Sequence, residues 1–90
     1  MKTIFKYVLA MGDLQHIPMP KGAEVLAVQT QDDLPCLWAL CDKHAPYVSR
    51  TVKIVGTGWT EADIQRDQYI GTFQQGPFVW HVFDLGEALR

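Results

Sequence analysis

The sequence predicts a mainly β fold, a small antiparallel β-sandwich or barrel of about six or seven strands with one or two short helical turns. Three observations predict it. Aromatic and β-branched residues recur in short runs with period-two alternation. Glycine, proline and aspartate clusters separate the runs at strand-length spacings. Ninety residues, 48% of them hydrophobic and 20% charged, suit one β-rich domain over residues 1–90.

The N-terminal half contains the first predicted strands. Residues 2–9 alternate clearly, and residues 14–17 form a short strand that Pro18 and Pro20 end, because proline cannot donate to a ladder. The apolar run in residues 24–30 is followed by a hairpin connection at 31–33. Residues 34–42 form the antiparallel return strand. Its Pro35 indicates that this strand begins at an edge or just outside the ladder.

The C-terminal half adds three strands, at residues 50–55, 68–74 and 78–83. Between the first two, Thr60 is followed three residues later by Asp63, which resembles a weak capping box and predicts a helical turn over 60–64. Residues 84–90 are expected to form a short helix or a frayed end. We expect alternate apolar residues of the strands to form the core: Phe5, Tyr7, Val25, Ala27, Leu37, Ala39, Ile54, Phe73, Trp80 and Val82.

Charge and hydropathy exclude several classes of partner. The net charge is −2, and the lysines and arginines are spread along the chain without a cluster. Binding to nucleic acid of any sequence needs several clustered phosphate contacts, so this composition argues against it. No apolar run approaches the roughly 20 residues that span a bilayer, and the N-terminus is too charged for a signal peptide. We therefore expect no membrane partner and a cytoplasmic location.

The cysteines and histidines supply metal-ligand types without the right geometry. Cys36, Cys41 and His44 follow a C-x4-C-x2-H spacing, and His81 lies in a later strand. Along a strand Cys36 and Cys41 point to opposite faces, so they cannot both reach one tetrahedral zinc ion. Nothing in the sequence marks an orienting group or an oxyanion hole for a cysteine nucleophile. We expect two reduced structural cysteines, no metal, no cofactor and no enzymatic activity.

The segment around Gly56-Thr57-Gly58-Trp59 is the candidate ligand-binding site. Two glycines bring backbone N–H groups close to an anion, and a tryptophan in a loop can stack on a base or contact a protein. Flanking cations would supply charge. The alternative is a β-turn or bulge that leads into a helical turn. The candidate ligand-binding residues are Lys53, Gly56, Thr57, Gly58, Trp59 and Arg66.

Six stretches, in order along nearly the whole chain, resemble a family of short phage and prophage proteins classed as a domain of unknown function. They are residues 1–7, 19–23, 35–40, 56–58, 69–73 and 81–83, which include Pro35-Cys36-Leu37-Trp38 and Tyr69-Ile70-Gly71-Thr72-Phe73. The resemblance implies a phage-related origin and a shared fold. It carries no catalytic residues.

These observations together predict a non-enzymatic, phage-type accessory protein that acts by binding. One hypothesis is counter-defence by sequestering a small nucleotide-like signal. The alternatives are a protein–protein inhibitor of a host defence or regulatory enzyme, and a virion or regulatory component. Residues 25–28 and 78–83 are apolar on both strand faces, which is more apolar surface than a small sandwich buries. We therefore expect a homodimer or higher homo-oligomer.

Overall fold

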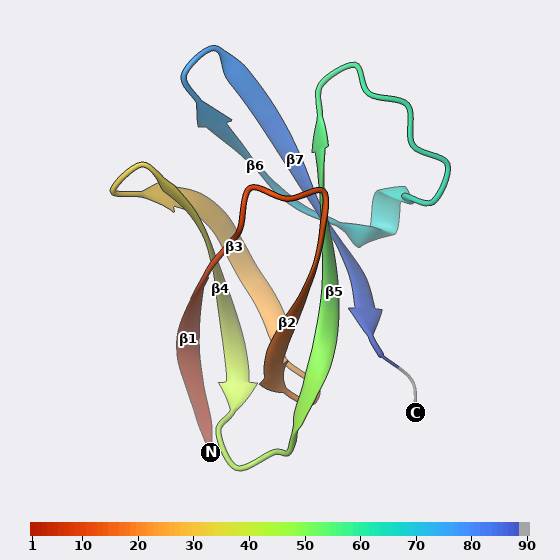
Figure 1. Cartoon of the computed structure of the whole chain (residues 1–90). Helices are drawn as coiled ribbons and strands as arrows, with labels where there is room; N and C mark the ends of the chain where they lie inside the picture. The colour runs from red at the N-terminus through yellow and green to blue at the C-terminus, as the bar shows by residue number, and fades with distance from the viewer. Residues whose placement is uncertain (89–90) are drawn as a thin grey trace.

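Seven strands form two antiparallel sheets in the computed structural model, which describes residues 1–88 (Figure 1). The smaller sheet has the strand order β1-β4-β3, and the larger sheet has the order β2-β5-β7-β6. This arrangement confirms the predicted mainly β, sandwich-like fold. The strands are β1 (Lys2–Val8), β2 (Leu14–Pro20), β3 (Glu24–Gln31), β4 (Leu34–Asp42), β5 (Tyr47–Gly56), β6 (Tyr69–Gln75) and β7 (Phe78–Glu87).

The core lies between the two sheets. On the smaller sheet, β4 directs Leu37 and Ala39 inward, and neither is exposed to solvent. On the larger sheet, Val52 of β5 and Val82 of β7 are equally buried. Successive side chains of a strand point to opposite faces, so one period-two pattern per strand is enough to build this core. Within residues 1–88, no helix is long and apolar enough to cross a membrane.

Nine of the ten predicted core residues lie in the core or pack against it. Five are buried, and Phe5, Tyr7, Val25 and Trp80 are half-buried against them. The prediction for Ala27 is wrong. A β-bulge between Val25 and Ala27 shifts the register, so Ala27 lies opposite Trp38 while Val28 takes the buried position.

The connections follow local turn chemistry. Asp32 and Asp33 both have positive φ, as the two-residue turn between β3 and β4 requires. Gly76 also has positive φ and, with Pro77, turns β6 into β7. Gly71 of β6 lies where a Cβ atom would come within 2.7 Å of the Val28 Cβ, so the absence of a side chain lets β6 pack closely along β3.

The predicted helical turn is misplaced. Residues 60–64 form an irregular loop, and the only helical turn among residues 1–88 is η1 (Arg66–Gln68), a 3-10 turn. Its N-terminus is capped by Gln65 and Gln68, whose side chains exchange hydrogen bonds with the backbone. Glutamine is a preferred residue at the second position of a capping box, whereas the Thr60–Asp63 pair lacks it. Asp63 instead forms an ion pair with a lysine of β5.

Two further expectations about strand ends are wrong. Pro18 and Pro20 do not stop pairing, because β2 is an edge strand that needs hydrogen bonds on one side only. Residues 84–87 continue β7 as a strand paired with β5, and residues 89–90 lie outside the described residues. The expectation for Pro35 is also wrong, because it is paired with Thr30 inside the β3–β4 ladder and β4 is the central strand of its sheet; Pro35 lies outside only the β1–β4 ladder, one residue beyond its last pair.

Candidate functional site

The tight turn after β5 places Trp59 against the backbone of Gly56. The Trp59 amide donates to the Gly56 carbonyl at 3.0 Å, and Gly58 supplies the positive φ that the turn needs. A Cβ atom on Gly56 would come within 2.8 Å of the Trp59 ring. Glycine at position 56 is therefore what allows the indole to lie across the end of the strand.

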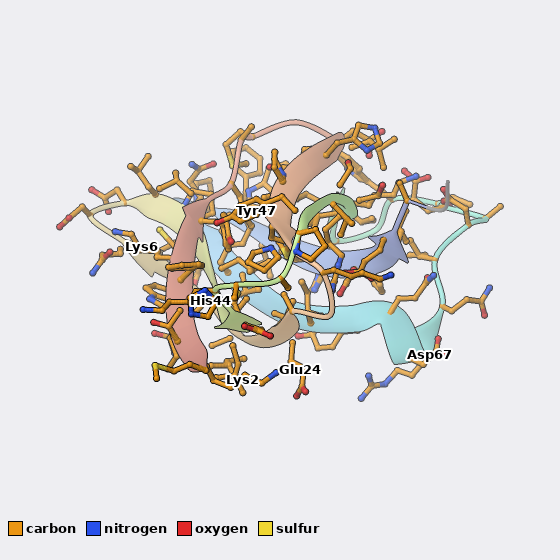
Figure 2. The ribbon with its side chains drawn as sticks, turned by 90° about the horizontal axis from the view of Figure 1, so that it is seen from below. Lys2, Lys6, Glu24, His44, Tyr47 and Asp67 are labelled. Atoms are coloured by element: carbon orange, nitrogen blue, oxygen red, sulfur yellow. The ribbon has the colours of Figure 1, made fainter. Side chains whose placement is uncertain are left out.

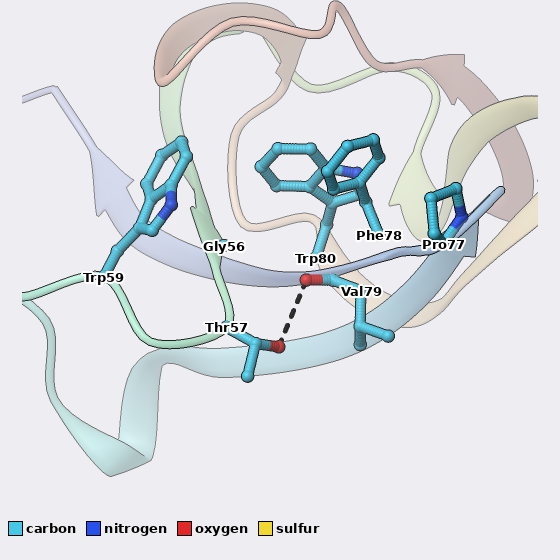
Figure 3. A pocket seen from close by; sticks show the side chains of 7 residues that line it. All are labelled: Gly56, Thr57, Trp59, Pro77, Phe78, Val79 and Trp80. Atoms are coloured by element: carbon cyan, nitrogen blue, oxygen red, sulfur yellow. Dashed lines mark hydrogen bonds between the residues drawn. The ribbon is translucent and has the colours of Figure 1, made fainter.

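Three aromatic side chains meet at this end of the larger sheet. The edge of one indole meets the face of the other in the Trp59–Trp80 pair, with ring centroids 5.5 Å apart. The ring centroid of Phe78 lies 6.0 Å from that of Trp80. Figure 3 shows the three rings on the same side of the β7 ribbon. Trp59 and Phe78 remain 53% and 60% exposed, so the group is accessible from solvent.

These rings line a cleft of about 370 Å³, here called the aromatic cleft. Its floor and walls come from the β5–β6 loop and from the β6–β7 hairpin, which brings residues distant in sequence together (Figure 3). None of the lining residues is ionisable. The lining residues are Gly56, Thr57, Trp59, Pro77, Phe78, Val79 and Trp80.

Trp80 contributes an unused hydrogen-bond donor beside the aromatic cleft. Its indole nitrogen is buried and has no hydrogen-bond partner within residues 1–88. The same ring also borders a smaller cavity of about 60 Å³, lined on its far side by Met11 and Gly12 of the β1–β2 loop. An unpaired buried donor costs free energy. A hydrogen bond from this nitrogen to a ligand acceptor would therefore contribute more binding free energy than a hydrogen bond from a solvated donor.

A chain of hydrogen bonds fixes Thr57 from the opposite face of the larger sheet. The Thr57 hydroxyl donates to the Val79 carbonyl at 3.2 Å, and its oxygen lies 2.8 Å from His81 Nε2. His81 Nδ1 lies 3.1 Å from the Thr72 hydroxyl, which Tyr69 contacts in turn. Both ring nitrogens of His81 thus have hydroxyl partners. The imidazole thereby links the turn after β5 to β6.

Lys53 lies on the other face of β5 from Gly56, because the two residues are an odd number of positions apart along the strand. Its ammonium group lies 3.0 Å from Glu61 and 3.0 Å from Asp63, and the residue is only 7% exposed. The hydrogen bonds to Asp63 and Glu61 raise the pKa of Lys53, and the hydrogen bond from Lys53 lowers the pKa of Asp63. The Lys53 charge is therefore used to hold the β5–β6 loop.

Arg66 lies on η1, away from the aromatic cleft. Its guanidinium carbon is 5.5 Å from the centre of the Tyr69 ring, a cation–π distance. Together with Ile64, Gln65 and Phe83, these residues border a second, shallower cleft of about 440 Å³. The second cleft is on the face of the sheet that carries Lys53, since Tyr69 and Lys53 are both paired with Phe83.

The six candidate residues from the sequence thus separate in space. Gly56, Thr57 and Trp59 line the aromatic cleft, Gly58 shapes its turn, and Lys53 and Arg66 lie elsewhere. Sequence reasoning missed the contribution of the β6–β7 hairpin, above all Phe78 and Trp80. The hairpin turn at residues 75–77 was visible in the sequence, but its pairing with the end of β5 was not.

The cysteines are buried and reduced. Cys36 and Cys41 are 1% and 0% exposed and form no disulfide. Among residues 1–88, no group of three or more histidine, cysteine, aspartate or glutamate side chains converges as a metal site would require. Cys41 packs inside the core, where an incoming substrate cannot reach its thiol.

In a comparison with protein families, residues 1–89 match a family described as a domain of unknown function, DUF7352. The chain belongs to this family. Comparisons of the DUF7352 chain with curated proteins and with solved structures give no significant match. Evidence about the function of this DUF7352 protein therefore comes from its own residues.

Proposed function

We propose that this DUF7352 protein is a non-enzymatic binding module whose aromatic cleft holds an aromatic or aliphatic side chain of a partner protein. The supporting observation is the exposure of Trp59 and Phe78 around a preformed cleft. Large aromatic side chains kept in solvent cost free energy in the free protein, and tryptophan is among the residues that contribute most to protein interfaces.

The charge distribution favours a protein partner over an anionic ligand. No lining residue of the aromatic cleft carries a charge, and the turn residue Thr57 already donates its hydroxyl to Val79. Lys53 is neutralised by two carboxylates on the opposite face of β5. A nucleotide phosphate in the cleft would thus lack the cationic partner that charge-assisted recognition uses. An apolar side chain needs no such partner.

The resemblance to phage and prophage proteins suggests where such binding would act. In our proposal the partner is a host defence or regulatory enzyme, which the protein inhibits by covering part of its surface. A role in the virion or in phage regulation would use the same cleft against a phage protein.

A small nucleotide-like ligand is the second candidate. The observation in its favour is the set of rings itself, because a base stacks on aromatic side chains regardless of its sequence identity. The buried Trp80 nitrogen would then donate to an acceptor on the base. This ligand would bind through its base, with its phosphates directed to solvent.

Two parallel measurements test the proposal. Immobilised protein captures partners from host lysate, and each captured protein is purified so that its affinity can be measured against variants. Trp59→Ala or Phe78→Ala should weaken binding at least 30-fold, which corresponds to about 2 kcal/mol for an interface hot spot. The matched control is Tyr47→Ala, because Tyr47 is equally exposed, at 58%, but lies at the other end of β5.

The second measurement is a thermal shift with a panel of cyclic and ADP-ribose-type nucleotides. We expect no shift. A ligand present at a hundredfold excess over its Kd would stabilise the fold by about 2.7 kcal/mol, a shift that is easily detected. A nucleotide that stabilises the wild type but not Trp59→Ala would replace the protein-partner proposal with the nucleotide one. Partner binding that survives both cleft substitutions would contradict the proposal that the partner binds in the aromatic cleft.

A further inference from the structure

The outer face of the smaller sheet is apolar and uncovered. The larger sheet packs on the inner face, so the even-numbered side chains of β1 point to solvent, and Ile4 and Val8 are 57% and 54% exposed. In the register of the sheet, Ile4 lies opposite Leu40 and Lys6 lies opposite Trp38. The result is a continuous apolar surface centred on β4, here called the outer face. It is separate from the aromatic cleft.

The charges on the outer face are arranged asymmetrically. Lys2 and Lys6 lie on β1, at one side, and Glu24 lies on β3, at the other side, although the Lys6 ammonium group reaches across the sheet and donates to the Gln31 side chain at 2.7 Å. Glu24 is in the same row as Ile4, because both are paired with Leu40 of the central strand. Figure 2 shows these three charged residues on the half of the molecule formed by β1, β4 and β3. Asp42 lies opposite Lys2 and forms an ion pair with the N-terminal ammonium group at 3.8 Å.

We propose that the outer face binds a second copy of this chain, with the two-fold axis parallel to β4. Rotation about this axis places β1 of one copy over β3 of the other at the same height along the strands. Glu24 of the second copy then faces Ile4. Lys2 and Lys6 are the neighbouring outward-facing residues of β1, one row on either side of Ile4. The apolar side chains of β4 meet across the axis. Sheets that pack face to face in this way are about 10 Å apart.

The sheet edges do not offer an equally good route to association. The edges of β3 and β6 pack along each other, and β2 carries Pro18 and Pro20. β1 carries two lysines, a residue type that blocks pairing of exposed edge strands. The uncovered apolar area therefore lies on a sheet face, and a second copy supplies a surface with a matching charge pattern.

The size of the outer face predicts a weak dimer. Three strands of about seven residues cover roughly 14 by 24 Å at ordinary strand spacings. This is below the roughly 800 Å² per partner that a standard stable interface buries. We therefore expect a Kd on the order of 10–100 μM, with monomer and dimer in rapid exchange.

Sedimentation equilibrium from about 5 μM to 1 mM tests the location of the interface. The wild type should change from monomer to dimer over this range. Ile4→Lys should stay monomeric, and Val8→Lys provides a second variant at an independent position. Leu14→Lys, which changes a 50% exposed leucine on β2, should dimerise like the wild type. A wild type that is monomeric at 1 mM, or a dimer that persists in both β1 variants, would overturn the proposal.

A charge exchange tests the axis. Glu24→Lys makes the charges of β1 and β3 on the outer face all positive, and the double variant Lys2→Glu/Lys6→Glu makes them all negative. Each variant alone should remain monomeric, because like charges would meet across the axis. An equimolar mixture should form the heterodimer at wild-type concentrations. Dimers of either variant alone, or a mixture that stays monomeric while the wild type dimerises, would exclude this axis.

Discussion

At the scale of single residues, two glycines determine how close other groups can approach. The absence of a side chain at Gly56 leaves room for the Trp59 ring, and its absence at Gly71 leaves room for Val28 between the sheets. Neither has positive φ, so the requirement at both positions is space rather than backbone conformation. The first controls the aromatic cleft and the second controls the core. A sequence pattern marks glycine at both positions but cannot distinguish these two reasons.

Gly56→Ala should displace the Trp59 indole while the fold is retained. The added methyl group would lie 2.8 Å from the ring, so the ring must move and lose its edge contact with Trp80. The lost aromatic pair should cost about 1 kcal/mol of unfolding free energy. Nuclear Overhauser contacts between the two indoles should disappear. Gly12→Ala is the control, since no atom lies within 4 Å of the added group; unchanged indole contacts in Gly56→Ala would contradict the prediction.

At the scale of elements, one ion-pair cluster replaces regular structure in the β5–β6 loop. The loop has no strand or helix over residues 60–65, and Glu61 and Asp63 attach it to Lys53 of β5. The loop carries Trp59 at its start. The position of the aromatic cleft therefore depends on an attachment several residues away on the other face of the sheet.

Acid should release this loop. The hydrogen bond from Lys53 lowers the pKa of Asp63 in the folded state. The ion pair therefore stabilises the folded loop fully above the ordinary aspartate pKa of about 4, and this stabilisation is lost as the pH falls through the lower pKa of the folded state. We expect the Trp59 indole resonance, assigned with Trp59→Phe, to shift toward its loop-released position below about pH 4.

Lys53→Met is the decisive variant for this transition. It should show the released Trp59 resonance already at pH 7 and no further acid step, because the two carboxylates no longer have a cation. Asp67→Asn changes an exposed acid on η1 and should keep the wild-type acid transition. If the wild type and Lys53→Met titrate identically, the ion pairs do not control the loop.

At the scale of the whole molecule, Arg50 joins both sheets at the end opposite the aromatic cleft. It is 7% exposed and lies 2.6 Å from Asp84 and 3.4 Å from Glu87 of β7. It also donates to the Ala23 carbonyl in the β2–β3 connection at 2.7 Å. The Gly22 amide donates a hydrogen bond to the Glu87 carboxylate. This hydrogen bond lowers the pKa of Glu87, and Arg50 makes a smaller contribution in the same direction. The network closes the sandwich where the chain passes from one sheet to the other.

Arg50→Met should therefore destabilise the fold by about 3 kcal/mol, because it leaves partly buried carboxylates without their cation. The midpoint of urea unfolding should fall accordingly, with the slope unchanged. Lys43→Met removes an exposed cation that forms no ion pair with another residue among 1–88 and should change stability by less than about 0.5 kcal/mol. Equal midpoints for the two variants would show that the network contributes little.

The sequence by itself determined the strands, most of the turns and nine of ten core residues, because these depend on neighbours within a few positions. Alternation reports the buried face of each strand, and residues such as Asp32 and Gly76 report turns. It also grouped Gly56, Thr57 and Trp59, which line one cleft in the structure.

Only the tertiary structure decided which groups meet across the chain. Strand pairing brought Trp80 and Phe78 to Trp59, and loop folding brought Glu61 and Asp63 to Lys53. The bulge that turned Ala27 away from the core depends on how β3 meets β4. These partners are distant in sequence, so no local pattern records them. The physical reason is that charge pairing and aromatic packing act through space, whereas periodicity reports only the direction of each side chain from its own strand.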